Sequence, residues 1–243
     1  MTDGARENNH GPRPPFPSDL TILDLLAQHA TATPDALALV LPEGERSPPG
    51  GVRREVPYRE MKEYVDQVAW ALTGANARSG SRWVMIVLPE GLAQVCAVWG
   101  VLAAGCGYVP IDIDTQASRL RTLIRETEPS AVIGEPGNTA LAEVAAEFPG
   151  MPFGTFPDSV ADGLFVSTQP SANGAAAPSE AQSAPHAPAV DDLALLLFSS
   201  GSTGVPKGIM YDHRWLMGGS WFLAKVRRPS FASVNHNIGN ILR

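Results

Sequence analysis

The sequence has little cysteine and no long apolar run. Its two cysteines, Cys96 and Cys106, lie in apolar surroundings without the spacing of a metal site or of a disulfide framework. We interpret both as core thiols of a reducing compartment. The first residues are polar and proline-rich, without the apolar core of a signal peptide, and no run of about eighteen apolar residues occurs anywhere. These absences favour a cytoplasmic protein that has no membrane partner.

Positive charge is also scarce. Lys and Arg number 18 against 25 Asp and Glu, for a net charge of −7, and no long basic run interrupts the chain. This balance argues against a nucleic-acid or anionic-membrane partner. A negatively charged ligand would therefore have to be held locally, by a few well-placed donors. Apolar residues make up 44% of the chain, which is enough for a sizeable core.

One short stretch concentrates such donors. Six apolar residues, 193–198, predict a buried strand, and the ten residues that follow contain four hydroxyl side chains, three glycines and Lys207. Glycines let backbone N–H groups approach an anion closely, hydroxyls add donors, and the lysine adds a mobile positive charge. The stretch is typical of a polyphosphate-binding loop.

Other glycine-rich motifs fit this stretch poorly. A P-loop requires Gly before its lysine and Ser or Thr after it, whereas Pro206 precedes Lys207 and Gly208 follows it. No serine has glycines two residues away on both sides, so the nucleophile elbow of hydrolases is not matched. No dinucleotide-binding GxGxxG follows any predicted strand. A flexible Gly/Ser linker remains an open alternative.

The apolar pattern elsewhere alternates between strand and helix. Predicted strands are 36–41, one ending at Val56, 83–88, 108–111, 131–133 and 193–198, the first two forming a hairpin. The first predicted helix begins after Ser18, which would be its cap, and further helices are predicted over 61–72, 92–102, 120–124 and 139–148. A last helix is predicted after Asp212, interrupted by Gly218 and Gly219. This order predicts an α/β fold with mostly parallel sheets covered by helices.

Composition divides the chain into five parts. We expect a disordered leader over 1–17, an α/β part over 18–166, a disordered Ala/Ser/Pro-rich insertion over 167–188, a strand, loop and helix over 189–226, and a tail without clear periodicity over 227–243. The insertion cannot bury enough apolar surface to offset the entropy of ordering.

Three motifs carry a resemblance to a known family. SSGSTGVPKG, followed by His213-Arg214, resembles the phosphate-binding motif of the adenylate-forming (AMP-binding) superfamily, and VPYREM is similar to its first core motif. VLAAGCGYVPIDIDTQASRL resembles the second core motif of peptide-synthetase adenylation domains, on Gly105, Gly107, Tyr108, Val109, Pro110, Asp112, Arg119 and Leu120. Ile113 and Gln116 depart from that motif, in which prolines are usual at both positions.

The resemblance implies the truncated, N-terminal part of the family's large domain, covering about 20–216. In complete form such a domain uses ATP and Mg²⁺ to activate a carboxylic acid and passes it to a phosphopantetheine or CoA thiol. For this chain the expected acid is an amino acid. Lys207 would neutralise departing pyrophosphate, and the β- and γ-phosphates would be held by Ser199, Ser200, Gly201, Ser202, Thr203 and Gly204. No catalytic residue or metal ligand is assigned.

The same resemblance limits what the chain alone is expected to do. The family's adenine-stacking aromatic residue, ribose-binding Asp and catalytic lysine have no counterpart in this sequence. We therefore expect the isolated chain to lack turnover, and its partners to include ATP, an acid, a carrier protein or the missing half of the domain. The alternative is a non-catalytic remnant or a phosphate-binding module.

Overall fold

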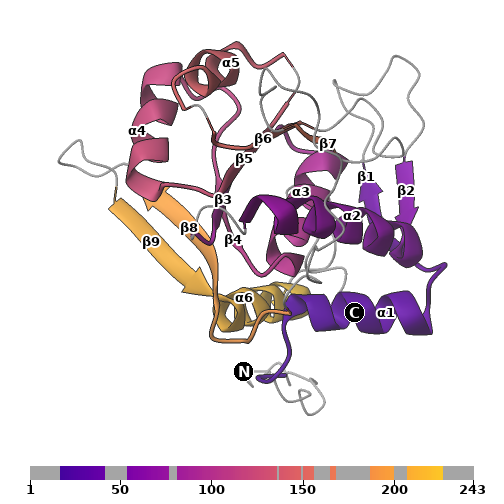
Figure 1. The fold of residues 1–243 in the computed structure, drawn as a ribbon. Coiled ribbons are helices and arrows are strands. Elements are labelled where there is room, and N and C mark those ends of the chain that lie inside the picture. Colours follow the sequence, from indigo (N-terminus) through magenta and orange to yellow (C-terminus); the bar gives the residue numbers. More distant parts are fainter. Residues whose placement is uncertain are drawn as a thin grey trace, which may run out of the picture.

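The computed structural model describes residues 17–41, 54–76, 81–135, 137–148, 150–155, 165–167, 187–199 and 207–226. Between residues 58 and 155 helices and strands alternate, as the sequence predicts (Figure 1). The helices are α1 (Ile22–Ala32), α2 (Tyr58–Asn76), α3 (Leu92–Ala103), α4 (Ala117–Thr127), α5 (Thr139–Ala145) and α6 (His213–Val226). The strands are β1 (Leu37–Leu41), β2 (Arg54–Pro57), β3 (Trp83–Val87), β4 (Gly107–Pro110), β5 (Ala131–Gly134), β6 (Phe153–Thr155), β7 (Phe165–Ser167), β8 (Leu193–Ser199) and β9 (Lys207–Asp212).

A seven-stranded sheet is the centre of the fold. Its strand order is β7-β6-β5-β3-β4-β8-β9. The five inner strands run parallel, and β7 and β9 are antiparallel to their neighbours at the two edges. Separately, β1 and β2 form the predicted antiparallel hairpin. The predicted α/β fold with a mainly parallel sheet is therefore confirmed.

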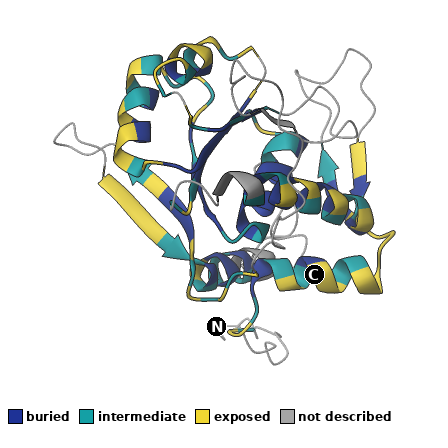
Figure 2. Cartoon of the chain, in the orientation of Figure 1, coloured by how far each residue is buried: buried dark blue, intermediate teal, exposed yellow. Residues whose placement is uncertain are grey.

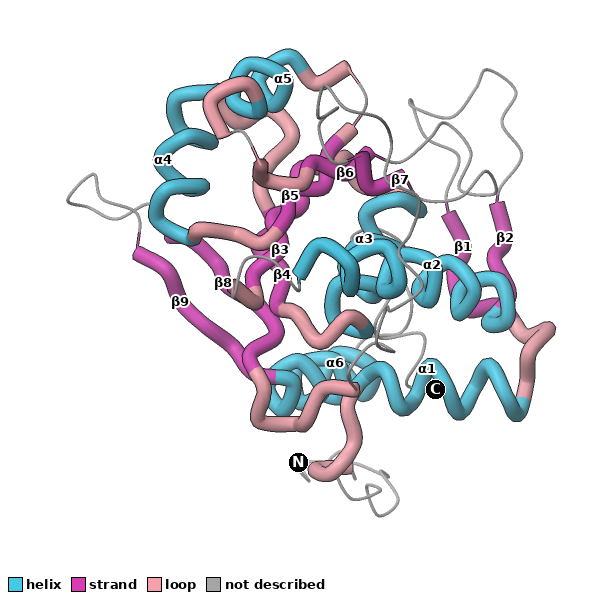
Figure 3. The backbone as a smooth tube through the Cα atoms, in the orientation of Figure 1, coloured by secondary structure: helices cyan, strands magenta, loops and turns pink. Residues whose placement is uncertain are grey.

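Helices cover both faces of this sheet (Figure 3). Val84 and Ile86 of β3 face a core built with α1, α2, α3 and α6, whereas Met85 and Val87 face a second core built with α4 and α5. The alternation follows from the two-residue period of a strand, and both sets are apolar because both faces are covered. Figure 2 shows the inner strands β3, β4 and β5 as buried between helices whose outer surfaces are exposed, while the edge strand β9 is largely exposed.

The α2–α3 contact depends on a glycine. A Cβ atom added to Gly100 of α3 would lie 2.2 Å from Cβ of Val68 on α2. Both residues belong to the region where the two helices pack, and Val68 is fully buried. Gly100 therefore allows the two helix backbones to approach closely beneath the sheet.

Two elements before β7 differ from the sequence-based expectation. The cap of α1 is Thr21 rather than Ser18, since the Thr21 hydroxyl accepts from the Asp24 amide and the Asp24 carboxylate accepts from the Thr21 amide. These reciprocal bonds form a capping box one turn after the predicted cap. In addition, Phe153–Thr155, which no predicted strand covers, forms β6 and adds to the sheet beside β5.

Other differences lie in the C-terminal half. Ser167, expected to begin the insertion, ends β7 and is the Cα partner of Phe153. Helix α6 continues through Gly218 and Gly219 instead of being interrupted. Strand β8 is buried only over residues 194–196, because Leu193 and Leu197 are 47% and 36% exposed. The leader before residue 17, residues 168–186 of the insertion and the tail after residue 226 lie outside the described residues.

Candidate functional site

The two ends of the predicted phosphate loop are held opposite each other. Ser199 is the last residue of β8, Lys207 is the first of β9, and the two are Cα partners in the antiparallel pair. We call this pair of strands the β8–β9 ribbon. The remaining predicted site residues, Ser200, Gly201, Ser202, Thr203 and Gly204, lie outside the described residues. Their role in holding phosphates stays a prediction.

The loop leaves the sheet at the edge where ligands usually bind in such folds. Strand β8 pairs in parallel with β4, through Tyr108 and Leu195, so both strands end on the same side. The segment after β4 begins the turn in which the Asp112 carboxylate accepts from the Asp114 amide at 2.9 Å. Open α/β sheets bind ligands outside the carboxyl ends of their strands. The structure thus brings the second resemblance motif next to the base of the loop.

Side chains of the ribbon near the loop are open to water. Lys207 is exposed, and Ile209 and Met210, on opposite faces of β9, are 47% and 58% exposed. By strand alternation, Lys207 shares its face with Ile209 and with Tyr211, which packs against the α1–α2–α3–α6 core. A phosphate group bound at the loop would therefore contact the Lys207 side chain on its solvent-exposed side.

The opposite end of the ribbon leads directly into α6. The Asp212 carboxylate accepts from the Trp215 amide at 2.7 Å, which confirms the predicted cap of this helix. The Tyr211 and Trp215 rings lie 4.0 Å apart between centroids. The start of α6 is thus fixed to the last residues of β9.

His213, the first residue of α6, is buried in this junction. Only 1% of its surface is exposed, and its Nδ1 atom has no hydrogen-bond partner among the described residues. Burial lowers the pKa of the imidazole below its usual 6.5, while the neighbouring carboxylates of Asp192, Asp212 and Asp24 act in the opposite direction. The sequence placed His213 beside the loop motif but gave no sign of this burial.

Two further features, a metal-ligand cluster and a membrane-spanning helix, are absent from the described ranges. There, no group of three or more His, Cys, Asp or Glu side chains is arranged to hold a metal ion. No helix of that part of the chain has the length and apolar character needed to cross a membrane.

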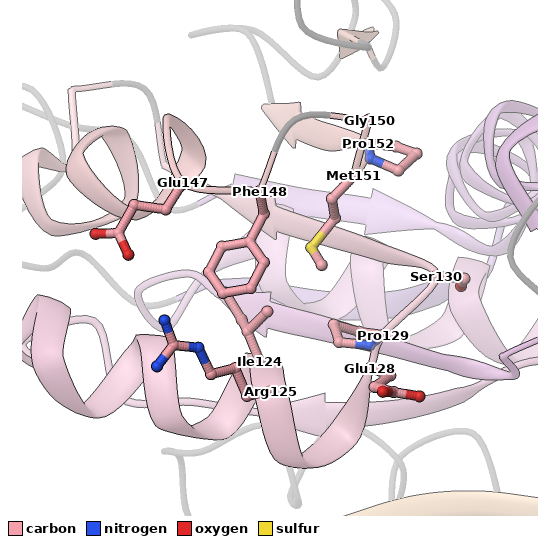
Figure 4. A pocket seen from close by; sticks show the side chains of 10 residues that line it. All are labelled: Ile124, Arg125, Glu128, Pro129, Ser130, Glu147, Phe148, Gly150, Met151 and Pro152. Carbon is pink, nitrogen blue, oxygen red and sulfur yellow. The ribbon is translucent and has the colours of Figure 1, made fainter.

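A cavity of about 660 Å³ lies at the other end of the sheet. Phe148 and Met151 project toward it from the segment before β6, and Arg125 approaches it from the end of α4 (Figure 4). Ser130 and Pro152, which also line it, immediately precede β5 and β6, so the cavity opens at the amino ends of the parallel strands. It is therefore separate from the edge at which the predicted phosphate loop begins.

Comparison with known proteins identifies relatives along most of the chain. The family model described as AMP-binding enzyme matches residues 26–235. The chain is 30% identical over 220 residues to CymA of Salinispora arenicola, described as a probable non-canonical nonribosomal peptide synthetase, and 29% identical over 211 residues to tyrocidine synthase 3 of Brevibacillus parabrevis. These alignments cover 90% and 87% of the chain but only 2% and 3% of the two relatives.

A solved structure shares the fold. It is the nonribosomal peptide synthetase FmoA3 bound to AMPPNP, with a TM-score of 0.63 at 21% identity. The match covers 95% of this chain and 22% of the FmoA3 chain. The described sheet and its helices thus correspond to one part of a much larger protein.

Proposed function

The chain belongs to the AMP-binding enzyme family, and on that premise we propose that it is the phosphate-binding part of an adenylation domain. In complete form the domain activates a carboxylic acid, an amino acid being the first candidate, with ATP to give an acyl-adenylate. The acyl group then passes to the thiol of a phosphopantetheine or of CoA. The isolated chain binds nucleotide phosphates without turnover.

One observation carries this proposal. The Cα pairing of Ser199 with Lys207 fixes both ends of the loop at the carboxyl edge of the parallel strands. This is the edge at which anions meet backbone N–H groups in open α/β sheets. The exposed Lys207 side chain adds a positive charge on the core-facing side of the ribbon.

The chemistry assigned to the loop is positioning and charge neutralisation. A carboxylate oxygen of the acid attacks the α-phosphorus of ATP, and the bond to the oxygen that bridges to the β-phosphorus breaks. The negative charge that develops on pyrophosphate is stabilised by Lys207 and by N–H and O–H donors of the loop. Mg²⁺ arrives with ATP, since it usually binds through substrate phosphates together with one or two carboxylates.

A second candidate, a phosphate-binding module that never turns over, is favoured by the open surroundings of the loop. Leu197, Ile209 and Met210 flank the site and are all exposed. Adenylate chemistry requires that water be excluded from a reactive intermediate. A complete enzyme would therefore need further polypeptide to cover this part of the ribbon.

Two assays separate these candidates. Binding of Mg·ATP by the purified chain is measured by equilibrium dialysis, and ATP–pyrophosphate exchange is measured with a panel of amino and aryl acids. We expect binding without exchange for the chain alone, and acid-dependent exchange after addition of a polypeptide that supplies the remainder of an adenylation domain.

Each assay can contradict part of the proposal. ATP–pyrophosphate exchange by the chain alone would refute the proposal that the chain needs further polypeptide for turnover. Binding that never leads to exchange, whatever polypeptide is added, would leave the phosphate-binding module as the function. If the chain binds no Mg·ATP, the phosphate-binding role of the loop is refuted for both candidate functions.

A further inference from the structure

Arg214 joins three separate segments at the base of the β8–β9 ribbon. Its guanidinium donates from Nε and Nη2 to Asp191 Oδ1 at 3.1 and 2.8 Å, and from Nη1 to the Ser18 carbonyl at 3.0 Å. Its backbone amide donates to the Val190 carbonyl at 2.8 Å. The turn that enters β8 is thereby tied to Arg214, the second residue after β9.

The ribbon changes register next to this attachment. At the base Leu193 is the Cα partner of Asp212, whereas from Leu195 and Tyr211 onward the pairing is regular up to Ser199 and Lys207. Strand β8 thus has one extra residue relative to β9, which is a β-bulge. A shift of one residue in the regular part would move Lys207 to the other face of the sheet.

Burial alone specifies this register only weakly near the loop. Ile209 and Met210 lie on opposite faces of β9 and have similar exposure, 47% and 58%. A one-residue shift would exchange one exposed apolar side chain for another, at little cost in buried area. Contacts at the base of the ribbon must therefore contribute to the register.

We propose that Arg214 is a positioning residue for Lys207, at the far end of the β8–β9 ribbon. By joining the 190–191 turn and Ser18 to the start of α6, it fixes the base of the ribbon and so the face on which Lys207 lies. The register part of this inference stands by itself, and its effect on nucleotide binding rests on the proposed function. Arg214 and Asp191 are 42% and 76% exposed, so their pair adds little to global stability.

Cross-strand disulfide trapping measures the register directly. Leu197→Cys with Ile209→Cys places thiols on directly opposed residues, whereas Leu197→Cys with Met210→Cys places them on opposite faces. The native cysteines are both buried, which keeps them out of the reaction. We expect rapid closure of the first pair in the native background and slow closure of the second.

The Arg214 variants then test the proposal. In Arg214→Ala we expect closure of the 197–209 pair to slow about fivefold, as for the loss of one well-formed exposed ion pair. Arg59→Ala, which removes an exposed arginine paired with Asp35 elsewhere, is the control and should leave closure unchanged. Asp191→Asn serves as a second variant in case Arg214→Ala folds poorly. Unchanged closure of the 197–209 pair in both variants would overturn the positioning role of Arg214.

Nucleotide binding gives the functional readout. Arg214→Ala should weaken Mg·ATP binding about fivefold, and closing the 197–209 disulfide in that background should restore it, because the bond locks the register. A purely structural role for Arg214 predicts no such rescue. If closure slows but the disulfide does not rescue binding, the positioning role is wrong. If the native chain binds no Mg·ATP, the proposed function fails while the closure rates still decide the register.

Discussion

Ser199 and Lys207 are Cα partners across the β8–β9 ribbon, so residues 200–206 begin and end at neighbouring points of the sheet. A loop whose ends are held together loses less conformational freedom when it closes around a ligand. Both points at which this segment joins the sheet therefore lie at the carboxyl edge of the parallel strands.

Replacement of Lys207 tests the charge assigned to the site. We expect Lys207→Ala to weaken Mg·ATP binding about tenfold or more, because a hydrogen bond to a charged group is worth ~1.5–3 kcal/mol. Isothermal titration calorimetry gives the dissociation constants. Lys62→Ala is a matched control, since Lys62 pairs with Asp66 on the surface of α2, far along the chain from the loop. Equal affinities in all three proteins would exclude Lys207 from the site.

The burial of His213 makes stability depend on pH. Because the folded-state pKa is lowered from 6.5, the unfolded chain binds more protons below about pH 6.5, and stability falls as the pH falls toward the folded-state value. Urea unfolding at several pH values between about 7.5 and 5.5 measures this loss. His213→Gln should show a shallower decline, by up to ~1.4 kcal/mol per pH unit. Parallel profiles for the two proteins would refute the assignment.

Two glycines predict opposite responses to the same substitution. A Cβ at Gly100 would meet Val68 at 2.2 Å, whereas a Cβ at Gly219 in α6 would have no atom within 4 Å. Gly100→Ala should destabilise the protein by about 1–3 kcal/mol through overpacking. Gly219→Ala should stabilise it by up to ~1 kcal/mol, because alanine favours helix over glycine.

Chemical denaturation of both glycine variants provides the measurement. Adding Val68→Ala to Gly100→Ala should recover part of the lost stability, since it removes the clashing side chain. If Gly100→Ala were as stable as the native chain, the close approach of α2 and α3 would not exist in solution.

The two cysteines should be inert in the folded protein. Cys96 and Cys106 are 0% and 4% exposed, and burial raises the pKa of the Cys96 thiol to about 12. Thiol reagents attack the thiolate, so a disulfide reagent at mildly alkaline pH should react slowly with the native chain. Both thiols should react at once in urea. A rapid first phase under native conditions would mean that one of them is accessible.

The sequence predicted most of the fold because its apolar pattern is regular where the sheet is buried on both faces. The residues of β3 and of α3 are almost entirely apolar, and the predicted elements there agree closely with the structure. Short elements lacked such a signal. Strand β6 has only three residues and is stabilised by its pairing with β5, a long-range contact that local periodicity does not encode.

The site was predictable in composition but not in arrangement. The glycines, hydroxyls and Lys207 indicated a phosphate loop from residue type alone, while β9 after the loop went unpredicted. Its residues pair with β8 although four of the six are exposed, so no apolar alternation marked them as a strand. Arg214 shows the same limit, since its acceptor at Ser18 lies at the other end of the sequence.

That last contact has a consequence for synthesis. Arg214 donates to the carbonyl of a residue 196 positions earlier, and α1 packs against α6 at the base of the sheet. During translation Ser18 leaves the ribosome long before Arg214 has been made. Helix α1 therefore cannot complete its packing until α6 has emerged, although it leaves the ribosome before every other helix of the described residues.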